Sequence, residues 1–265
     1  MLKAISFDLW ETLITDKPEN LRRQERLRLT RIEAILGEDV SACPERSRRD
    51  RIERAYRSVW HRCQELYWSR DHDISCRRQI EHFLEDLGLD PASFDEPVLA
   101  EIEHAYANAA IEELPEPVDG AGETLAELKS RGFGIGLISN TGRTPGYALR
   151  QILAELGLAE SIDVMVFSNE HGRCKPQTSI FEELRRGLGV AYEEMAFVGD
   201  NLYVDVHGAQ RCGMRGIHFD PPARGSAIAP VVEHGLEIVP DSTVTSLREL
   251  LDFVGAPVVT MIDER

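Results

Sequence analysis

The amino-acid sequence predicts an α/β protein in which a helical segment interrupts a parallel sheet. Beyond Pro115, short apolar runs alternate with amphipathic segments, the pattern of βαβ units. An apolar strand at Leu2–Leu9 opens the chain, and the block that follows it has helical apolar spacing without a convincing strand. The simplest topology is a Rossmann-like parallel sheet core with an inserted all-helical cap. The expected division is core at 1–15 and 115–265, and cap at 16–114.

Each core element is expected where an apolar run or an amphipathic stripe occurs. The later strands are expected at Phe133–Ile138, Val164–Phe167, Met195–Val198 and Ile217–Phe219, with a last one at Leu236–Val239. The helices between and after them are expected at Ala121–Ser130, Tyr147–Leu156, Ser179–Leu188, Val204–Cys212 and Val244–Val254.

Three or four helices are expected in the cap, because apolar residues recur there at helical spacing. Asp73-Ile74-Ser75 is a suitable N-terminal cap for the helix that carries Ile80 and Phe83, and Gly88 is a suitable stop. The run Pro44–Arg57 is rich in arginine, which is typical of a solvated helix face.

Composition narrows the classes of partner. The formal net charge of −16 argues against nucleic acid and anionic membrane surfaces, since both recruit cationic proteins. No apolar run approaches the roughly 18 residues of a membrane span, and the N-terminus shows no signal-peptide pattern, so a cytoplasmic protein is expected.

Five cysteines without a CxxC pair indicate reduced thiols, not a zinc site or a disulfide framework. The oligomeric state stays open between monomer and dimer.

Polar residues follow the predicted strands at their C-terminal ends. Asp8 lies at the end of the first strand, and the second ends in Ser139-Asn140-Thr141-Gly142. Lys175 precedes the helix expected at Ser179, and the fourth strand leads into an acidic pair, Asp200 and Asp205. Taken singly, these are an ordinary turn, a solvated lysine and helix-capping acids. Taken in order, they meet at the one sheet edge where α/β folds place ligands, which favours a phosphoryl-transfer site.

The motifs resemble those of the haloacid dehalogenase (HAD) superfamily, with a helical cap inserted after the first motif. The resemblance implies that Asp8 attacks the substrate to form an aspartyl intermediate, that Ser139 holds the transferring group, and that Lys175 neutralises charge. It implies Mg²⁺ as cofactor, and the ligands it implies are Asp8, the backbone carbonyl of Trp10, Asp200 and Asp205. A carboxylate that attacks a phosphate needs cations beside it, which agrees with these roles. The expected partner is a small anionic organic substrate, contacted by Trp10, Thr12 and Asn140.

Trp10 departs from the phosphatase pattern, which has a second Asp two residues after the nucleophile as general acid and base. An indole cannot shuttle a proton, and such help is typically worth about 10² to 10⁴ in rate. The dehalogenases of the superfamily carry an aromatic residue here, but they dispense with the metal and lack the first acid of the last motif, which Asp200 retains. A Mg²⁺-dependent phosphatase is therefore favoured. The alternatives are a 2-haloacid dehalogenase and a phosphate- and Mg²⁺-binding module with weak catalysis.

The acid that replaces the missing Asp stays open. The candidates are Glu11, which is equally suited to turn structure, and the histidines His61, His72, His82, His104 and His171, each of which also suits a surface or packing role. A second open question is the role of the basic residues from Lys17 to Arg70, which outnumber the acidic ones there. They either attract an anionic substrate or pair with neighbouring Glu. The aromatic residues there line a pocket or pack the cap interior; they are Tyr56, Trp60, Tyr67 and Trp68.

Overall fold

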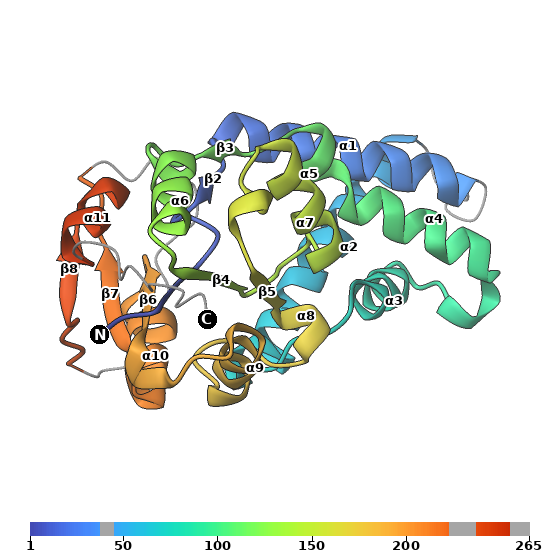
Figure 1. Ribbon diagram of the computed structural model, residues 1–265. Coiled ribbons are helices and arrows are strands. Elements are labelled where there is room, and N and C mark those ends of the chain that lie inside the picture. Colours follow the sequence, from blue (N-terminus) through green and yellow to red (C-terminus); the bar gives the residue numbers. More distant parts are fainter. Residues whose placement is uncertain (38–44, 223–236, 255–265) are drawn as a thin grey trace, which may run out of the picture.

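A computed structural model describes residues 1–37, 45–222 and 237–254 (Figure 1). Its centre is a parallel six-stranded sheet in the order β5-β4-β1-β6-β7-β8, which confirms the predicted fold class. The strands are β1 (Ala4–Phe7), β4 (Gly134–Ser139), β5 (Val164–Phe167), β6 (Met195–Gly199), β7 (Arg215–Phe219) and β8 (Ser242–Val244). The strand that ends before Asp8 thus lies between the strands that end at Ser139 and Gly199.

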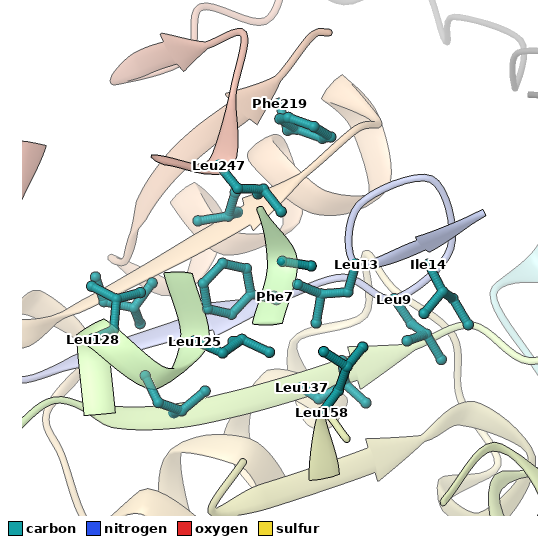
Figure 2. Close-up of a cluster of buried hydrophobic side chains, with 14 of the residues drawn as sticks. Phe7, Leu9, Leu13, Ile14, Leu125, Leu128, Leu137, Leu158, Phe219 and Leu247 are labelled. Carbon is teal, nitrogen blue, oxygen red and sulfur yellow. The ribbon is translucent and has the colours of Figure 1, made fainter. Parts of the chain in front are cut away.

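Alternate residues of the strands point to opposite faces of the sheet, as the period of two requires. Phe7 and Leu137 join a cluster with α6 (Ala121–Ser130) and α7 (Gly146–Glu155), part of which Figure 2 shows. Ile138 and Phe197 join the cluster on the other face, with α9 (Thr178–Leu188) and α10 (Gly208–Cys212). The sheet is therefore the middle layer between helices on both faces (Figure 1), so its C-terminal edge is left to carry polar groups.

The predicted core elements differ from the observed ones mainly near the C-terminus. The last strand is Ser242–Val244, so the prediction of Leu236–Val239 is wrong where the structure describes it, at 237–239. Asp241 sets this register, because its backbone N–H donates to Gly216 O at 2.9 Å and its Oδ2 accepts from Gly216 N at 2.8 Å. The helix expected at Val244–Val254 is shorter: a 3₁₀ turn at Leu247–Glu249 followed by α11 (Leu250–Phe253). The helix expected to begin at Val204 begins at Leu202 as a π-helical turn, Leu202–His207, before α10.

The helical block from α1 to α5, residues 18–112, is called the cap here. It contains α1 (Pro18–Leu36), α2 (Glu45–Leu66), α3 (Cys76–Asp86), α4 (Glu96–Ala107) and α5 (Ala109–Glu112), with 3₁₀ turns at Trp68–Arg70 and Pro91–Ser93. A separate hydrophobic cluster fills its interior, including Ile32, Val59, Phe83 and Tyr106. Ser75 caps α3 by accepting from Arg78 N at 3.2 Å, as its position in the sequence predicts.

Two short strands carry the chain into and out of the cap. β2 (Ile14–Thr15) pairs antiparallel with β3 (Glu116–Pro117). Behind this ribbon, the Asn20 side chain donates to Asp16 Oδ1 at 2.6 Å and to the carbonyls of Glu113 and Leu114 at 3.1 and 2.9 Å. The separate clusters and this ribbon support the division into core and cap at about residues 15 and 115, which we retain as a proposal.

Several expectations about single residue types can be followed in the described residues. The cysteines described there are free thiols, namely Cys63, Cys76, Cys174 and Cys212, as expected; Cys43 lies outside them. In the basic run, Arg49 pairs with Glu33 of α1 and with Glu53, and Arg57 pairs with Glu53, which supports the expected pairing of these arginines with neighbouring Glu. In the described part of the chain, no helix has the length and apolar character needed to cross a membrane.

Gly136 is a position where the sheet permits no side chain. A Cβ there would lie 2.6 Å from Ser6 Oγ and 2.7 Å from Leu184 Cδ1, between β1 and α9. We expect Gly136→Ala to lower the free energy of unfolding by about 1–3 kcal/mol, because an overpacked core must shift. Gly122→Ala is the control: its Cβ would meet only Leu158 Cδ2, at an ordinary 3.5 Å, so we expect no loss. Urea unfolding of the two variants measures both; equal stability would contradict the packing account.

Candidate active site

Asp8 lies directly beyond β1, in the middle of the sheet edge. Its backbone N–H donates to Val198 O at 2.8 Å, which continues the pairing of β1 with β6. The residue is only 8% exposed, and burial raises the pKa of its carboxyl to about 6 even though the Lys175 ammonium acts to lower it. Thr12 Oγ1 approaches Asp8 Oδ2 at 3.4 Å from the turn that follows. The predicted nucleophile thus sits in a site largely shielded from solvent.

Lys175 is the cation of the site and is 2% exposed. Its Nζ lies 2.5 Å from Asp8 Oδ1 and 2.7 Å from Asp205 Oδ1, and it donates to Ile138 O at 3.0 Å. Burial alone would lower the pKa of this lysine, but the two carboxylates outweigh burial and raise the pKa above its usual range. The ammonium therefore stays charged and binds the first and last motifs to each other.

Asn140 holds the backbone of Lys175. Its Oδ1 accepts from Lys175 N at 2.8 Å, and its Nδ2 donates to Lys175 O at 3.1 Å. The side chain thereby ties the loop after β4 to the lysine loop. The sequence pattern did not indicate this role, and the expected contact of Asn140 with substrate stays a prediction.

Ser139, the last residue of β4, presents a hydroxyl with no protein partner. The residue is 0% exposed, and its Oγ makes no hydrogen bond to any residue in the described part of the chain. A buried hydroxyl left in this state is costly unless a ligand engages it. Its place beside Asp8, one strand away, suits a group that binds to an anion held at the nucleophile.

The acidic pair joins Asp8 in one cluster. Oxygen atoms of Asp8, Asp200 and Asp205 lie within 4.8 Å of one another, a spacing that can hold a metal ion. Asn201 N donates to Asp205 Oδ2 at 3.0 Å, and this orients the second acid of the pair. Gly199 is required here, because a Cβ would lie 2.3 Å from the Asp205 carboxylate. Three carboxylates are the hard oxygen donors that Mg²⁺ prefers, so the donor set fits the expected cofactor.

The turn after Asp8 contains Trp10 and Glu11. The Trp10 side chain is partly buried and packs against the core cluster that contains Phe7 and Leu9. Glu11 adopts a left-handed conformation with φ 60°, and its backbone N–H donates to Ile14 O at 2.7 Å. Thr15 Oγ1 donates to both Glu11 carboxylate oxygens at 3.2 and 3.0 Å. These contacts support the turn-forming reading of Glu11.

The histidine candidates are spread over the molecule. His82 is buried within the cap, next to Tyr67 Oη at 3.0 Å and Arg62 at 2.9 Å. His104 is exposed and contacts Asn108, and His171 contacts Glu183 and Ser179. His61 is exposed on α2, and only His72 lies in a cap segment that pairs with the core.

The aromatic cluster of the cap meets the core through an arginine. The Arg143 guanidinium lies over the Tyr56 ring at 4.1 Å and over the Trp60 ring at 4.6 Å. Trp60 also packs on Trp68 with ring centroids 4.6 Å apart, and Tyr67 packs beside His82. These aromatic residues therefore pack the cap and its junction with the loop after β4, which extends the packing interpretation.

Sequence reasoning missed Asp73. Its sequence position predicts only a part in a helix cap, but its Oδ2 accepts from Ser168 Oγ at 2.5 Å and from Thr141 Oγ1 at 2.9 Å, both in the core. Its partners are distant in the sequence, and no local pattern marks them.

Comparison with known proteins places this geometry in a family. The family described as haloacid dehalogenase-like hydrolase matches residues 2–213. The glyceraldehyde 3-phosphate phosphatase of Methanopyrus kandleri is 31% identical over 263 residues, which cover 96% of this chain and 97% of that protein. The ribulose-1,5-bisphosphate 5-phosphatase of Halopiger xanaduensis is 33% identical over 57% of this chain and 62% of its own length.

Two solved structures share the fold. A HAD phosphatase from Thermococcus onnurineus superposes with a TM-score of 0.61 at 23% identity, covering 97% of this chain and 99% of its own. A 2-haloacid dehalogenase from Pseudomonas syringae pv. Tomato DC3000 gives 0.66 at 24% identity, covering 96% and 98%. Together with the family match along most of its length, these findings lead to one conclusion: the chain belongs to the haloacid dehalogenase-like hydrolases.

Proposed function

We propose that the protein is a Mg²⁺-dependent phosphatase that acts on a small phosphorylated metabolite, with Asp8 as nucleophile. The observation that carries the proposal is the cluster in which Lys175 Nζ lies 2.5 Å from Asp8 and oxygens of the three carboxylates lie within 4.8 Å of one another. Relatives named as phosphatases of small sugar phosphates and of phosphoserine support the substrate class.

In this proposal, an Asp8 oxygen attacks the phosphorus of the ester, and the bond from phosphorus to the leaving oxygen breaks. Lys175 stays protonated and offsets the negative charge that gathers between the nucleophile and the transferring group. Ser139 Oγ donates to an oxygen of that group. Water then attacks the aspartyl phosphate, which releases inorganic phosphate and restores the Asp8 carboxylate.

The residues that would hold Mg²⁺ are Asp8, Asp200, Asp205 and the backbone carbonyl of Trp10. When bound, the ion supplies a divalent positive charge that lets an anionic nucleophile approach an anionic ester. The retained Asp200 favours the phosphatase over the dehalogenase, because it completes a cluster of three carboxylates, two of them paired with Lys175, whose oxygens suit a divalent metal ion.

Position 10 offers no side chain that can donate a proton to the leaving oxygen. Trp10 has no acidic group to lend, and Thr15 engages the Glu11 carboxylate. We therefore propose that the leaving oxygen takes its proton from solvent, so substrates with good leaving groups react fastest.

Asp8→Asn should abolish phosphate release from p-nitrophenyl phosphate, because the amide is not a nucleophile and no longer pairs with Lys175. The measurement is colorimetric release of p-nitrophenol with Mg²⁺, with Asp90→Asn as control, an exposed cap carboxylate that accepts only from its own turn. Retained activity in Asp8→Asn would refute the nucleophile.

Removal of the metal separates the phosphatase from the dehalogenase. We expect a chelator to abolish phosphate release and added Mg²⁺ to restore it, and Asp200→Asn to raise the Mg²⁺ concentration needed by about tenfold or more. The assay is a panel of phosphorylated metabolites and 2-haloacids with Mg²⁺ and with chelator. Chloride release in chelator without phosphatase activity would instead establish the dehalogenase, and Mg²⁺ binding without either activity would establish the binding module.

Trp10→Asp should preserve or raise the rate toward poor leaving groups, by up to about 10²-fold, because it supplies a general acid two residues after the nucleophile. Alkyl phosphates and p-nitrophenyl phosphate, compared in kcat, test this dependence on the leaving group. A lower rate of Trp10→Asp toward every substrate would count against the account of this position.

A further inference from the structure

One short piece of the cap, residues 71–73, contacts two of the loops that form the site. It connects the 3₁₀ turn at Trp68–Arg70 to α3. Its backbone pairs antiparallel with the loop that leads into Lys175: Cys174 N donates to Asp71 O at 2.9 Å, and Asp73 N donates to Gly172 O at 3.2 Å. The pairing ends one residue before the catalytic lysine.

The Asp73 carboxylate divides its two oxygens between cap and core. Oδ1 accepts from Trp68 Nε1 at 2.9 Å and from Ile74 N at 2.8 Å, both in the cap. Oδ2 accepts from the core hydroxyls of Ser168 and Thr141 at 2.5 and 2.9 Å. Ser168 Oγ also accepts from Thr141 N at 2.7 Å, so the carboxylate fixes both the side chain and the backbone of Thr141.

This carboxylate is held without a cation. Asp73 is 7% exposed, and within the described residues it forms no salt bridge with a Lys or Arg; its partners are hydroxyl and N–H donors. Burial raises the pKa of Asp73, and the hydrogen bonds from Ser168, Trp68, Ile74 and Thr141 counteract that rise. A buried acid stabilised only by such donors adds little to stability, because burial offsets what the donors contribute. What the arrangement does provide is a fixed relation between cap and core.

The rest of the loop after β4 is also held by the cap. Gln79 Nε2 donates to Gly142 O at 2.9 Å, Arg143 lies over the Tyr56 ring, and Arg28 approaches Thr144 Oγ1 at 3.4 Å. With Asp73 at Thr141, each residue from 141 to 144 has a cap partner. The cap therefore sets the path of the loop that begins at Ser139 and Asn140.

We propose that Asp73 is a positioning residue for the reaction: it aligns the cap with the loop after β4 and thereby places Ser139 and Lys175. Asp73 is connected to the lysine through few residues: Thr141 follows Asn140, whose side-chain amide bonds the backbone N–H and carbonyl of Lys175. This inference rests on the proposed function of the site. Displacements of about 1 Å at reacting groups are enough to cost about 10²-fold in rate.

The kinetic test uses the full chain with p-nitrophenyl phosphate and Mg²⁺, well below the unfolding transition. We expect Asp73→Ala to lower kcat by about 10- to 100-fold while KM changes less than about threefold. Asp73→Asn should recover most of the rate, because the amide oxygen serves the cap donors and the hydroxyls of Ser168 and Thr141 can accept from the amide NH₂. An unchanged kcat in Asp73→Ala would overturn the inference.

Trp68→Phe is the matched control, because it removes a donor from the same carboxylate on the cap side and leaves the core side intact. We expect it to lower the unfolding temperature while kcat stays within about twofold of the parent. If Asp73 acted only on stability, both variants would unfold earlier and neither would change kcat. Ser168→Ala tests the route: combined with Asp73→Ala it should add no further loss in kcat, whereas multiplying losses would contradict a shared path.

A measurement independent of hydrolysis distinguishes this inference from the proposed function. We expect Asp73→Ala to accelerate amide hydrogen exchange about tenfold in residues 139–144 and 172–175, and Trp68→Phe to leave exchange there unchanged. Unchanged exchange in Asp73→Ala refutes the positioning role whether or not the protein releases phosphate. Faster exchange together with no phosphate release from the parent protein refutes the phosphatase and retains the coupling of cap and loop.

Discussion

The charge of one buried lysine determines how the rest of the site is arranged. Lys175 Nζ is enclosed by Asp8, Asp205 and the carbonyl of Ile138, so the ammonium has polar partners on several sides where little of it is exposed to solvent. Taking an ammonium or a carboxylate out of water costs several kcal/mol, and only close partners offset that cost. The lysine allows two acids to be buried at one sheet edge, and the acids keep the lysine charged. Without either, the cluster would have to open to solvent or change its protonation.

The same charge balance explains why a metal ion suits this site and why Trp10 is tolerated. The ammonium pairs with two of the three clustered carboxylates, and the oxygens of the three acids are the donors that a hard divalent cation prefers. An aromatic side chain at position 10 adds no fourth acid to this balance and packs against the core instead. For the proposed phosphoryl transfer, stabilisation of charge matters more than proton transfer, and Lys175 is placed to supply it.

The strand-end residues could be predicted from the sequence because they follow a rule of the fold. Parallel strands share one C-terminal edge, so Asp8, Ser139 and Gly199 converge once β4, β1 and β6 are neighbours. Asp73 could not be found in this way, since its core partners lie 68 and 95 residues away and hydrogen bonds to hydroxyls leave no periodic pattern.

The last strand and the Asn140 link could not be predicted either, because contacts between residues distant in the sequence determine them. The last strand was misplaced onto an apolar run because the residue that fixes its register is polar, Asp241, bonded to Gly216. The link of Asn140 to the lysine backbone joins loops 35 residues apart, and nothing in the turn sequence marks it. Apolar periodicity predicts the helices and strands and the edge of the sheet where the site lies. Contacts between loops become visible only in the three-dimensional structure.

The ribbon formed by β2 and β3 has a consequence for how such a chain can vary. The chain enters the cap through β2 and leaves it through β3, and these two strands pair with each other, Ile14 opposite Pro117. The cap is therefore joined covalently to the core at one place, through this two-stranded ribbon. All six strands of the central sheet belong to the core, and none comes from the cap. Changes to the inserted helices therefore leave the strand pairing untouched, and where they keep the contacts of Asp73 with the core, new substrate preferences can arise while the loops of the site stay in place.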